Sequence, residues 1–207
     1  FFGSGSFMPL DGCECWVQRL SYVGELGFEI FIPAKYATKV YRAIMAAGAE
    51  FDIRNAGLHT LNSMRLEKGF RHWGHDIGAE DNLVQAGLSF VAKPEAGDFL
   101  GRDAFAAQKA AGLPNRRLVQ FLLDDPEPLL YHNEAILMDG EAVGYLTSAM
   151  YGHSLGAAMG MGYVNKADLH AEALSRANFE IDVAGERYSA KASLKAFYDP
   201  SGERMRC

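Results

Sequence analysis

The amino-acid sequence predicts an α+β fold that ends in a small β-barrel or β-sandwich. The first half of the 207-residue chain alternates β-prone segments with stretches of helical periodicity. After Pro114 the chain changes to short apolar segments of strand length, separated by turn signals. This change of pattern at residues 111–115 predicts two domains, residues 1–112 and residues 113–207.

Two strands are predicted near the start of the chain. Residues 14–22 and residues 27–32 are apolar and β-prone, and the Gly-Glu-Leu-Gly sequence between them predicts a turn. Pro33 ends the second segment, because proline cannot donate a hydrogen bond to a neighbouring strand. This second strand carries Glu29 within the run Phe-Glu-Ile-Phe-Ile, where a charged side chain needs an explanation.

Three helices are predicted in the first half. They cover residues 34–48, residues 56–69 and, as a short third helix, residues 101–111. A glycine follows or ends each of them, as is typical of helix C-termini. The apolar side of the second helix is predicted to consist of Leu58, Leu61 and Met64.

The second half is predicted to be mostly β-structure. The strand-like segments lie at residues 116–123, 134–138, 141–150, 157–164 and 178–194. The last of these is expected to form a hairpin that turns at residues 184–186. Asp139-Gly140 is the strongest hairpin signal in the chain, because a type I′ turn needs a positive φ at both central positions. Residues 166–177 are the one helical candidate in this half.

The composition argues against several classes of function. The formal net charge of −6 disfavours nucleic acid as the main partner, since phosphate binding needs a basic surface. The three cysteines, Cys13, Cys15 and Cys207, match neither a disulfide framework nor a zinc site, so we expect a reducing compartment, the cytoplasm or the mitochondrial matrix. No apolar run approaches the ~18 residues of a membrane span. Because the chain begins with phenylalanine, we expect it to be part of a longer protein.

The position of Glu29 allows two interpretations. On a strand, alternate side chains point to opposite faces, so Phe28, Ile30 and Ile32 should face the core while Glu29 and Phe31 face away from it. Glu29 is then either a solvent-facing residue of a half-exposed strand or a carboxylate at the floor of a pocket. In a pocket it would accept two parallel hydrogen bonds from a planar pair of N–H groups.

The segment Arg-His-Trp-Gly-His-Asp at residues 71–76 also allows a functional and a structural interpretation. The spacing of His72 and His75 suits a metal on a helix, but Gly74 disfavours the helix and no further ligand cluster lies nearby in the sequence, so we expect no metal site. Trp73 is either a core aromatic residue or the wall of a pocket.

Basic residues form a second cluster with two interpretations. Arg65, Lys68 and His72 follow one flank of the second predicted helix, which is either a solvated face or a cradle for an anion. Arg116 and Arg117 could add to such a cradle.

The chain contains no motif for a nucleophile or a nucleotide loop. Residues 156–162 hold three glycines, but the surrounding sequence is β-prone and lacks the strand–helix context of a dinucleotide site. There is no G-x-S-x-G sequence and no Walker sequence. The residues alone therefore predict a binding fold without an obvious nucleophile or general base.

Four stretches of the chain resemble, in order, the tetrahydrofolate-dependent aminomethyltransferase family of the glycine-cleavage T-protein. They are SYVGELGFEIFIP at residues 21–33, GLHTLNSMRLEKGFRHWGHDI at 57–77, QAGLSFVAKPEAGDFLGRDAF at 85–105 and VGYLTSAMYGHSLGAAMGMGYV at 143–164. The Y-x-G-E-x-G-x-E sequence in the first stretch is a specific motif. The resemblance extends from about residue 14 to residue 200, nearly the whole chain.

The resemblance implies a fold, a cofactor and a set of binding residues. Family members have an α+β folate-binding region of three lobes around a central opening, and they end in a β-barrel. Tyr22 and Glu29 match the tyrosine and the last glutamate of the motif, which hold the pterin ring of tetrahydrofolate. Phe90 matches an aromatic residue that lines the same pocket, and Trp73 lies where T-proteins often have tyrosine.

Within the family, residues 65–77 and 151–156 are more similar to the folate domains of sarcosine and dimethylglycine dehydrogenases. There the folate domain follows a domain that contains FAD, so the resemblance implies FAD only where such an upstream flavin domain exists. Leu61 stands where T-proteins have an arginine that contacts folate, which also favours this branch. The family's catalytic aspartate lies in an N-terminal portion outside this chain, so we expect no catalytic residue here and an inactive isolated chain.

The sequence thus predicts transfer of a one-carbon unit, as an aminomethyl or iminium group, from an amine donor to tetrahydrofolate. The expected product is 5,10-methylene-tetrahydrofolate, formed in a protein like sarcosine or dimethylglycine dehydrogenase. The alternatives are a stand-alone glycine-cleavage-type aminomethyltransferase, a methyltransferase of the same fold and a non-catalytic folate-binding relative. A further alternative is a fragment that binds nothing.

Overall fold

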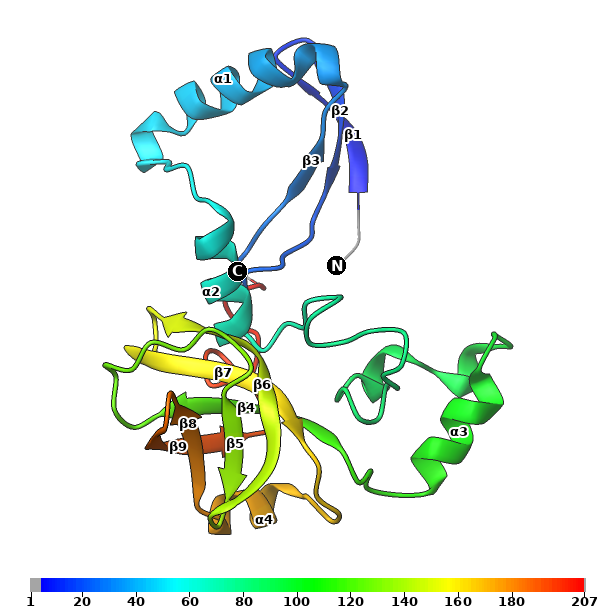
Figure 1. Ribbon diagram of the computed structural model, residues 1–207. Coiled ribbons are helices and arrows are strands. Elements are labelled where there is room, and N and C mark those ends of the chain that lie inside the picture. The colour runs from blue at the N-terminus through cyan, green and yellow to red at the C-terminus, as the bar shows by residue number, and fades with distance from the viewer. Residues whose placement is uncertain (1–4, 207) are drawn as a thin grey trace. The chain divides into compact units, whose positions relative to one another are not determined.

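The computed structural model describes residues 5–206 of the chain (Figure 1). The chain divides into two compact units. Unit 1 comprises Phe1–Asn62 and Ser201–Cys207, and unit 2 comprises Ser63–Pro200. The predicted domain boundary between residues 112 and 113 lies within unit 2, shortly before the first barrel strand. The division into residues 1–112 and 113–207 stays a prediction.

Unit 1 contains a three-stranded antiparallel sheet in the order β1-β2-β3. The strands are β1 (Gly5–Leu10), β2 (Cys13–Gln18) and β3 (Glu29–Phe31). The two strands predicted from the sequence are present but shorter, while β1 was not predicted. A turn at Asp11-Gly12, with φ values of 47° and 73°, joins β1 to β2 and matches the type I′ geometry of tight hairpins.

One helix covers one face of this sheet. The helical segments are η1 (Ala34–Tyr36), α1 (Ala37–Ala47) and η2 (Ala49–Phe51), within or next to the predicted helix. The core of unit 1 consists of Cys13, Cys15 and Val40, packed with Leu10, Ile32 and Ile44. The prediction that three apolar residues of the second strand face the core holds for Ile32 alone. Phe28 is 57% exposed and Ile30 is also exposed, because β3 is a three-residue strand at the edge of the sheet.

The helix α2 (Leu58–Glu67) contains the boundary between the two units. Its predicted apolar side is wrong at Leu58, which is 69% exposed, while Leu61 and Met64 are half-buried. The buried residues lie at the other end of the helix and include Ser63, Leu66 and Glu67. Leu66 packs against the outside of the barrel, on Leu118, Met159, Met161 and Tyr163. Beyond α2, the short segments η3 (Ser89–Val91) and η4 (Pro94–Ala96) precede the helix α3 (Arg102–Ala110).

Unit 2 ends in a closed six-stranded antiparallel barrel with the order β4-β7-β6-β5-β8-β9 (Figure 1). The strands are β4 (Arg117–Leu123), β5 (Ala135–Met138), β6 (Glu141–Gly152), β7 (Ala157–Val164), β8 (Phe179–Val183) and β9 (Glu186–Ser193). The barrel closes because β9 pairs with β4. A short helix, α4 (Ala171–Arg176), lies between β7 and β8. The predicted α+β class is confirmed. Of the two predicted forms of the second half, a barrel or a sandwich, the structure has the barrel.

The predicted turns organise the barrel. Asp139 and Gly140 have φ values of 52° and 85°, as the type I′ hairpin requires, and Ala184 and Gly185 repeat this geometry at 54° and 94°. The glycine-rich segment at residues 156–162 leads into strand β7, as its β-prone surroundings predicted.

Gly162 fits a place where two strands approach closely. A methyl group added at its Cα would lie 2.3 Å from the backbone oxygen of Tyr145 and 2.9 Å from Ile136 Cδ1. The barrel therefore needs a residue without a side chain at this position.

We expect Gly162→Ala to lower the free energy of unfolding by about 1–3 kcal/mol, the usual cost of overpacking a core, because backbone atoms must move. Chemical denaturation followed by circular dichroism measures this change. Gly78→Ala is the matched control in the same unit, since its added methyl group would meet the nearest atom at 3.8 Å. Equal stability of the two variants would contradict the argument from close approach.

Candidate functional site

The basic residues at the end of α2 are buried in ion pairs, so neither predicted interpretation of this flank is right. Arg65 Nη1 lies 2.6 Å from Asp76 Oδ2, and both side chains are almost wholly buried. Lys68 Nζ lies 2.7 Å from Asp199 Oδ2. The two cations are thus neither solvated nor free to cradle an anion.

The carboxylate of Asp76 collects hydrogen bonds from two further groups. The backbone N–H of His72 donates to Oδ2 at 2.9 Å, and Thr147 Oγ1 donates to Oδ1 at 2.6 Å. Arg65 Nη2 in turn donates to Ser148 Oγ at 2.8 Å. These bonds fix the segment that carries Trp73 against strand β6. Asp76 is therefore a structural acceptor, and the described residues contain no cluster of three metal-ligating side chains.

We expect Asp76→Ala to lower the free energy of unfolding by roughly 3–5 kcal/mol, because it leaves Arg65 charged and unpaired in the interior. Glu172→Gln is the control, since it removes an exposed ion pair with Arg176 on α4 and should cost less than about 1 kcal/mol. Denaturant titration measures both changes. A loss at Asp76 as small as that at Glu172 would show that the buried pair does not support the fold.

The predicted cofactor residues of unit 1 lie in and next to the sheet. Glu29 is the first residue of β3 and pairs with Gln18 of β2, while Tyr22 lies in the connection between these strands and is half-buried. The side chain of Glu29 is exposed. Within the described chain, no hydrogen bond or ion pair engages its carboxylate, which leaves both oxygens available to a ligand.

Glu29 shares its face of the sheet with aromatic residues. The registers place Phe7, Trp16 and Phe31 opposite one another on the three strands, and Phe31 is two residues from Glu29. Phe7 and Trp16 meet edge to face with ring centroids 5.1 Å apart. A methyl group added at Gly5 would lie 2.4 Å from the Trp16 ring, so the indole lies directly over that glycine.

Sequence reasoning missed the position of Trp16 on the face of Glu29. The signal that could have found it is the alternation in Cys-Glu-Cys-Trp-Val-Gln, which places Cys13 and Cys15 in the core and Trp16 on the face of Glu29. The cysteines are free thiols in contact, with their sulfur atoms 3.7 Å apart.

Glu25, in the predicted Gly-Glu-Leu-Gly turn, holds the C-terminal segment of unit 1. Arg204 Nε donates to both carboxylate oxygens of Glu25, at 3.1 Å and 2.9 Å. Arg19 Nη2 donates to the backbone oxygen of Met205 at 3.2 Å. These contacts restrain the connection that carries Tyr22.

The predicted cofactor residues of unit 2 are exposed aromatic side chains. Trp73 is 67% exposed and forms an isolated β-bridge with Ile77, and Phe90 lies in η3 and is 74% exposed. Trp73 is therefore not a core residue. The structure gives two predicted residues in each unit, and a common site for all four stays a prediction.

Arg116 and Arg117, the other candidates for anion binding, have partners of their own. Arg116 Nη1 lies 2.5 Å from Asp81 Oδ1. Arg117 Nη1 donates to the backbone oxygen of Leu169 at 2.8 Å, and burial lowers its pKa. Both guanidinium groups thus contribute to the fold of unit 2.

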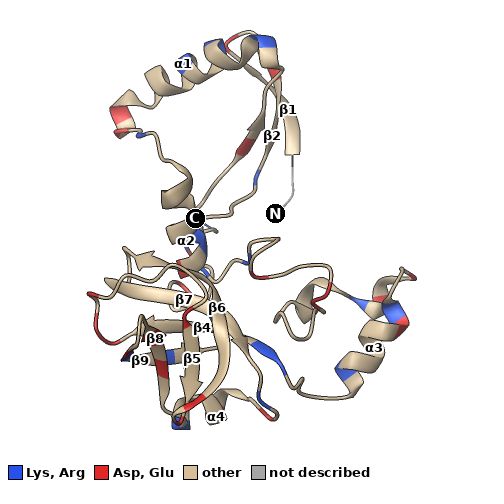
Figure 2. Cartoon of the chain, viewed as in Figure 1, with Lys and Arg blue, Asp and Glu red and all other residues tan. Residues whose placement is uncertain are grey.

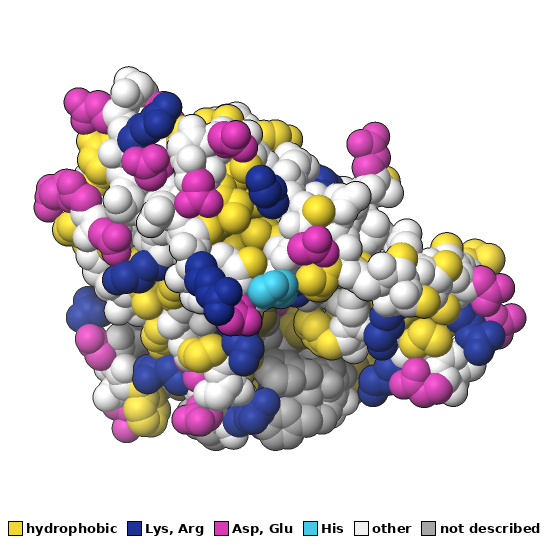
Figure 3. Space-filling view, turned by 90° about the horizontal axis from the view of Figure 1, so that it is seen from below, with side chains coloured by type: hydrophobic (Ala, Val, Ile, Leu, Met, Phe, Trp, Pro, Cys, Tyr) yellow, Lys and Arg dark blue, Asp and Glu magenta, His cyan; other side chains and the backbone are white. Residues whose placement is uncertain are grey.

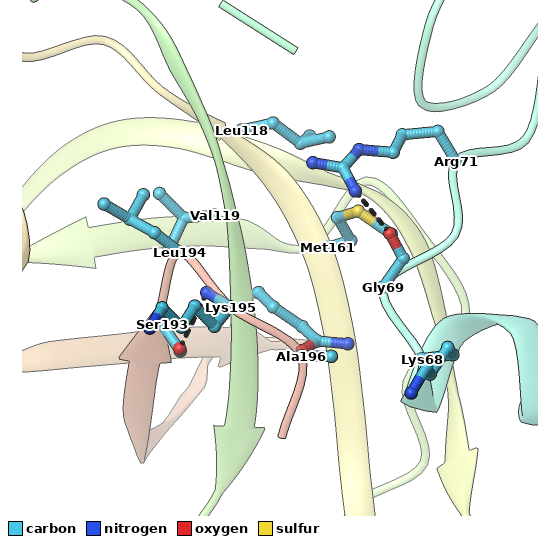
Figure 4. A pocket seen from close by; sticks show the side chains of 11 residues that line it. Lys68, Gly69, Arg71, Leu118, Val119, Met161, Ser193, Leu194, Lys195 and Ala196 are labelled. Atoms are coloured by element: carbon cyan, nitrogen blue, oxygen red, sulfur yellow. Dashed lines mark hydrogen bonds between the residues drawn. The ribbon is translucent and has the colours of Figure 1, made fainter. Parts of the chain in front are cut away.

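A small polar cavity lies where the end of α2 meets the barrel (Figure 4). It encloses ≈ 40 Å³ and is lined by residues that include Lys68, Arg71 and Lys195. Arg71 Nη1 donates to the oxygen of Gly69 at 2.7 Å, and burial lowers the pKa of the guanidinium. A space of this size suits a few ordered waters rather than a cofactor.

Charged residues of both signs are distributed along both units (Figure 2). On the face drawn in Figure 3, acidic and basic side chains are interspersed with small apolar groups. This pattern differs from the continuous basic surface that nucleic acid binding needs. In the described part of the chain, no helix has the length and apolar character to cross a membrane.

Two family models match the chain, in the order that the fold suggests. The GCVT N-terminal domain matches residues 1–96, and the glycine cleavage T-protein C-terminal barrel domain matches residues 116–199. The chain belongs to the glycine cleavage T-protein family. The resemblance seen in the four sequence stretches is therefore confirmed, and the second model covers the observed barrel.

Individual relatives support the same assignment. The chain is 43% identical to 4-methylaminobutanoate oxidase (formaldehyde-forming) of Paenarthrobacter nicotinovorans over 98% of its own length and 24% of the relative's. It is 38% identical to human mitochondrial sarcosine dehydrogenase over 99% of its own length and 22% of the relative's. The chain thus spans about a quarter of these relatives.

A solved structure has the same fold. The glycine cleavage system aminomethyltransferase T of Bartonella henselae superposes with a TM-score of 0.80 at 24% identity, covering 97% of this chain and 53% of that one. This likeness confirms the predicted aminomethyltransferase fold.

Proposed function

We propose that this chain is the tetrahydrofolate-binding part of a protein that transfers one-carbon units from an amine donor, with 5,10-methylene-tetrahydrofolate as the product. Membership of the glycine cleavage T-protein family supports the general reaction. The observation that carries the assignment to this chain is the exposed, unengaged carboxylate of Glu29 on a sheet face lined by aromatic residues.

The residues around Glu29 fit a flat heterocycle with an N–H edge. A carboxylate accepts two parallel hydrogen bonds from a planar pair of N–H groups, as the 2-amino and N3 positions of a pterin offer. Phe31 and Trp16 on the same face add the aromatic surface against which such a ring can pack. In the proposed site Glu29 orients the pterin, and Tyr22 of the same unit packs beside it.

When bound, tetrahydrofolate supplies the amine nitrogen that accepts the one-carbon unit. The contribution of this chain is positioning and exclusion of water, because a carbon at the oxidation level of formaldehyde is readily hydrolysed. The Glu25–Arg204 ion pair assists by restraining the connection that carries Tyr22.

We further propose that the whole protein is like a sarcosine or dimethylglycine dehydrogenase, with a flavin domain upstream of this chain. The 38% identity to human sarcosine dehydrogenase supports this context, as does Leu61 in place of the arginine of T-proteins. The parent reading frame tests it, since a dinucleotide-binding fingerprint before residue 1 is expected. A parent that lacks the fingerprint would favour a stand-alone aminomethyltransferase.

We expect Glu29→Gln in the full-length protein to weaken tetrahydrofolate binding by about 2 kcal/mol, roughly thirtyfold, because an amide cannot accept both hydrogen bonds. Isothermal titration calorimetry measures the affinity. Glu50→Gln is the matched control, since Glu50 is an exposed carboxylate in η2 of the same unit. Unchanged binding in the Glu29 variant would remove this residue from the site, and folate that gives this chain no thermal protection would favour a fragment that binds nothing.

A second candidate function is release of the one-carbon unit as formaldehyde. The 43% identity to a relative named as a formaldehyde-forming oxidase favours it. The two functions differ in how the product responds to tetrahydrofolate. In the full-length protein, transfer predicts that added tetrahydrofolate replaces formaldehyde by 5,10-methylene-tetrahydrofolate, whereas simple release predicts a rate of formaldehyde formation that does not change.

A further inference from the structure

Unit 2 contains a hollow that the proposed folate site does not use. It encloses ≈ 620 Å³, within the range of about 300–1,000 Å³ that is usual for small-molecule pockets. The loop at residues 74–85 forms one wall, and the barrel strands β6 and β7 form another through Tyr145, Thr147 and Tyr163. Arg116, at the entrance to β4, completes the lining.

Tyr163 places an unsatisfied hydroxyl group at this hollow. Its side chain is only 4% exposed, and no described group makes a hydrogen bond with its hydroxyl oxygen. Burial raises the pKa of Tyr163, as does the nearby Asp81 carboxylate, while Arg116 partly offsets the shift. The hydroxyl therefore keeps its proton at physiological pH and can donate it to an acceptor. A buried donor left without a partner is costly, which is the usual mark of a group that meets water or a ligand.

The Asp81 carboxylate near this hydroxyl already accepts two other hydrogen bonds. Asp81 Oδ2 accepts the backbone N–H of Gly78 at 2.7 Å, and Oδ1 accepts Arg116 Nη1 at 2.5 Å. The guanidinium carbon of Arg116 lies 3.5 Å from the centroid of the Tyr163 ring. Arg116 is also partly exposed, and a guanidinium has five N–H donors, so donors of Arg116 remain available over the Tyr163 ring.

The charges of the hollow restrict what it can bind. Arg116 contributes one positive charge, while Asp81 and Glu80 contribute two negative charges. A dianion is therefore disfavoured, and a simple cation would leave the two donors unsatisfied. A ligand with one carboxylate and one ammonium group matches both the donors and the acidic residues of the hollow. Its carboxylate can accept hydrogen bonds from Arg116 and Tyr163, and its ammonium group can form an ion pair with Glu80.

We propose that this hollow is a second small-molecule site, which binds a compact zwitterion of the amino-acid class. The hollow shares no lining residue with the proposed folate site, because none of the four predicted cofactor residues lines it. Its recognition elements are the Tyr163 hydroxyl and the Arg116 guanidinium for the carboxylate, and Glu80 for the ammonium group.

The test uses glycine as the probe, with glycinamide and acetate as analogues that lack one charged group each. Two-dimensional NMR titration of this chain should show saturable shifts for glycine at residues 74–85 and in β6 and β7. Glycinamide and acetate should each bind about tenfold more weakly or not at all, the factor that corresponds to ~1.4 kcal/mol. Acetate that binds as tightly as glycine would overturn recognition of the ammonium group, and no saturable shift with glycine would overturn the site.

Two variants separate binding from folding. Tyr163→Phe removes the unsatisfied hydroxyl without a change in shape, so the ligand-free protein should melt at an unchanged or higher temperature while glycine affinity falls about tenfold, the effect of losing one good hydrogen bond. Tyr131→Phe is the control, because Tyr131 is exposed and does not line the hollow. Glycine affinity that is equal in the two variants would overturn the role of Tyr163.

Discussion

The ion pair between Arg65 and Asp76 is the interaction on which unit 2 depends. A helix, a loop and a barrel strand each supply part of it, since Arg65 lies on α2, Asp76 follows the Trp73 segment, and Thr147 and Ser148 come from β6. Two charges taken out of water repay their desolvation only when geometry and hydrogen bonding are good. Here the carboxylate has three donors, which makes the arrangement of these three segments specific as well as stable.

The residues that follow Arg65 extend the same principle. Glu67 is 2% exposed, and its carboxylate accepts the backbone N–H groups of Ser154 and Leu155 at 2.6 Å and 3.2 Å, where β6 turns into β7. Lys68 joins Asp199, beyond the last barrel strand. The C-terminal turn of α2 is thus a polar junction that ties together segments from the middle and the end of the chain.

Features with a local cause could be predicted from the sequence, whereas those that depend on distant partners, such as this junction, could not. The barrel turns were predicted because Asp139-Gly140 carries its own conformational preference. The buried side of α2 was not, because the burial of Arg65 and Lys68 depends on partners 11 and 131 residues away. Alternation places Glu29 and Phe31 on one face, but β1 was not predicted, and its Phe7 completes that face by pairing with β2.

A few charged and aromatic residues lie where a simple globular domain would not place them. Charges that normally lie in water are buried at the end of α2, whereas the aromatic residues Phe31, Trp73 and Phe90 are more than half exposed. Buried charges that are held by ion pairs and hydrogen bonds stabilise one arrangement of the fold, so their role is structural. Phe31 shares its face of the sheet with Trp16 and Phe7, and exposed aromatic residues that cluster in this way indicate a surface that binds something flat and apolar. The usual pattern of exposed charges and buried aromatic residues thus has two kinds of exception. We interpret the buried charges as residues that stabilise the fold and the exposed aromatic residues as candidates for binding.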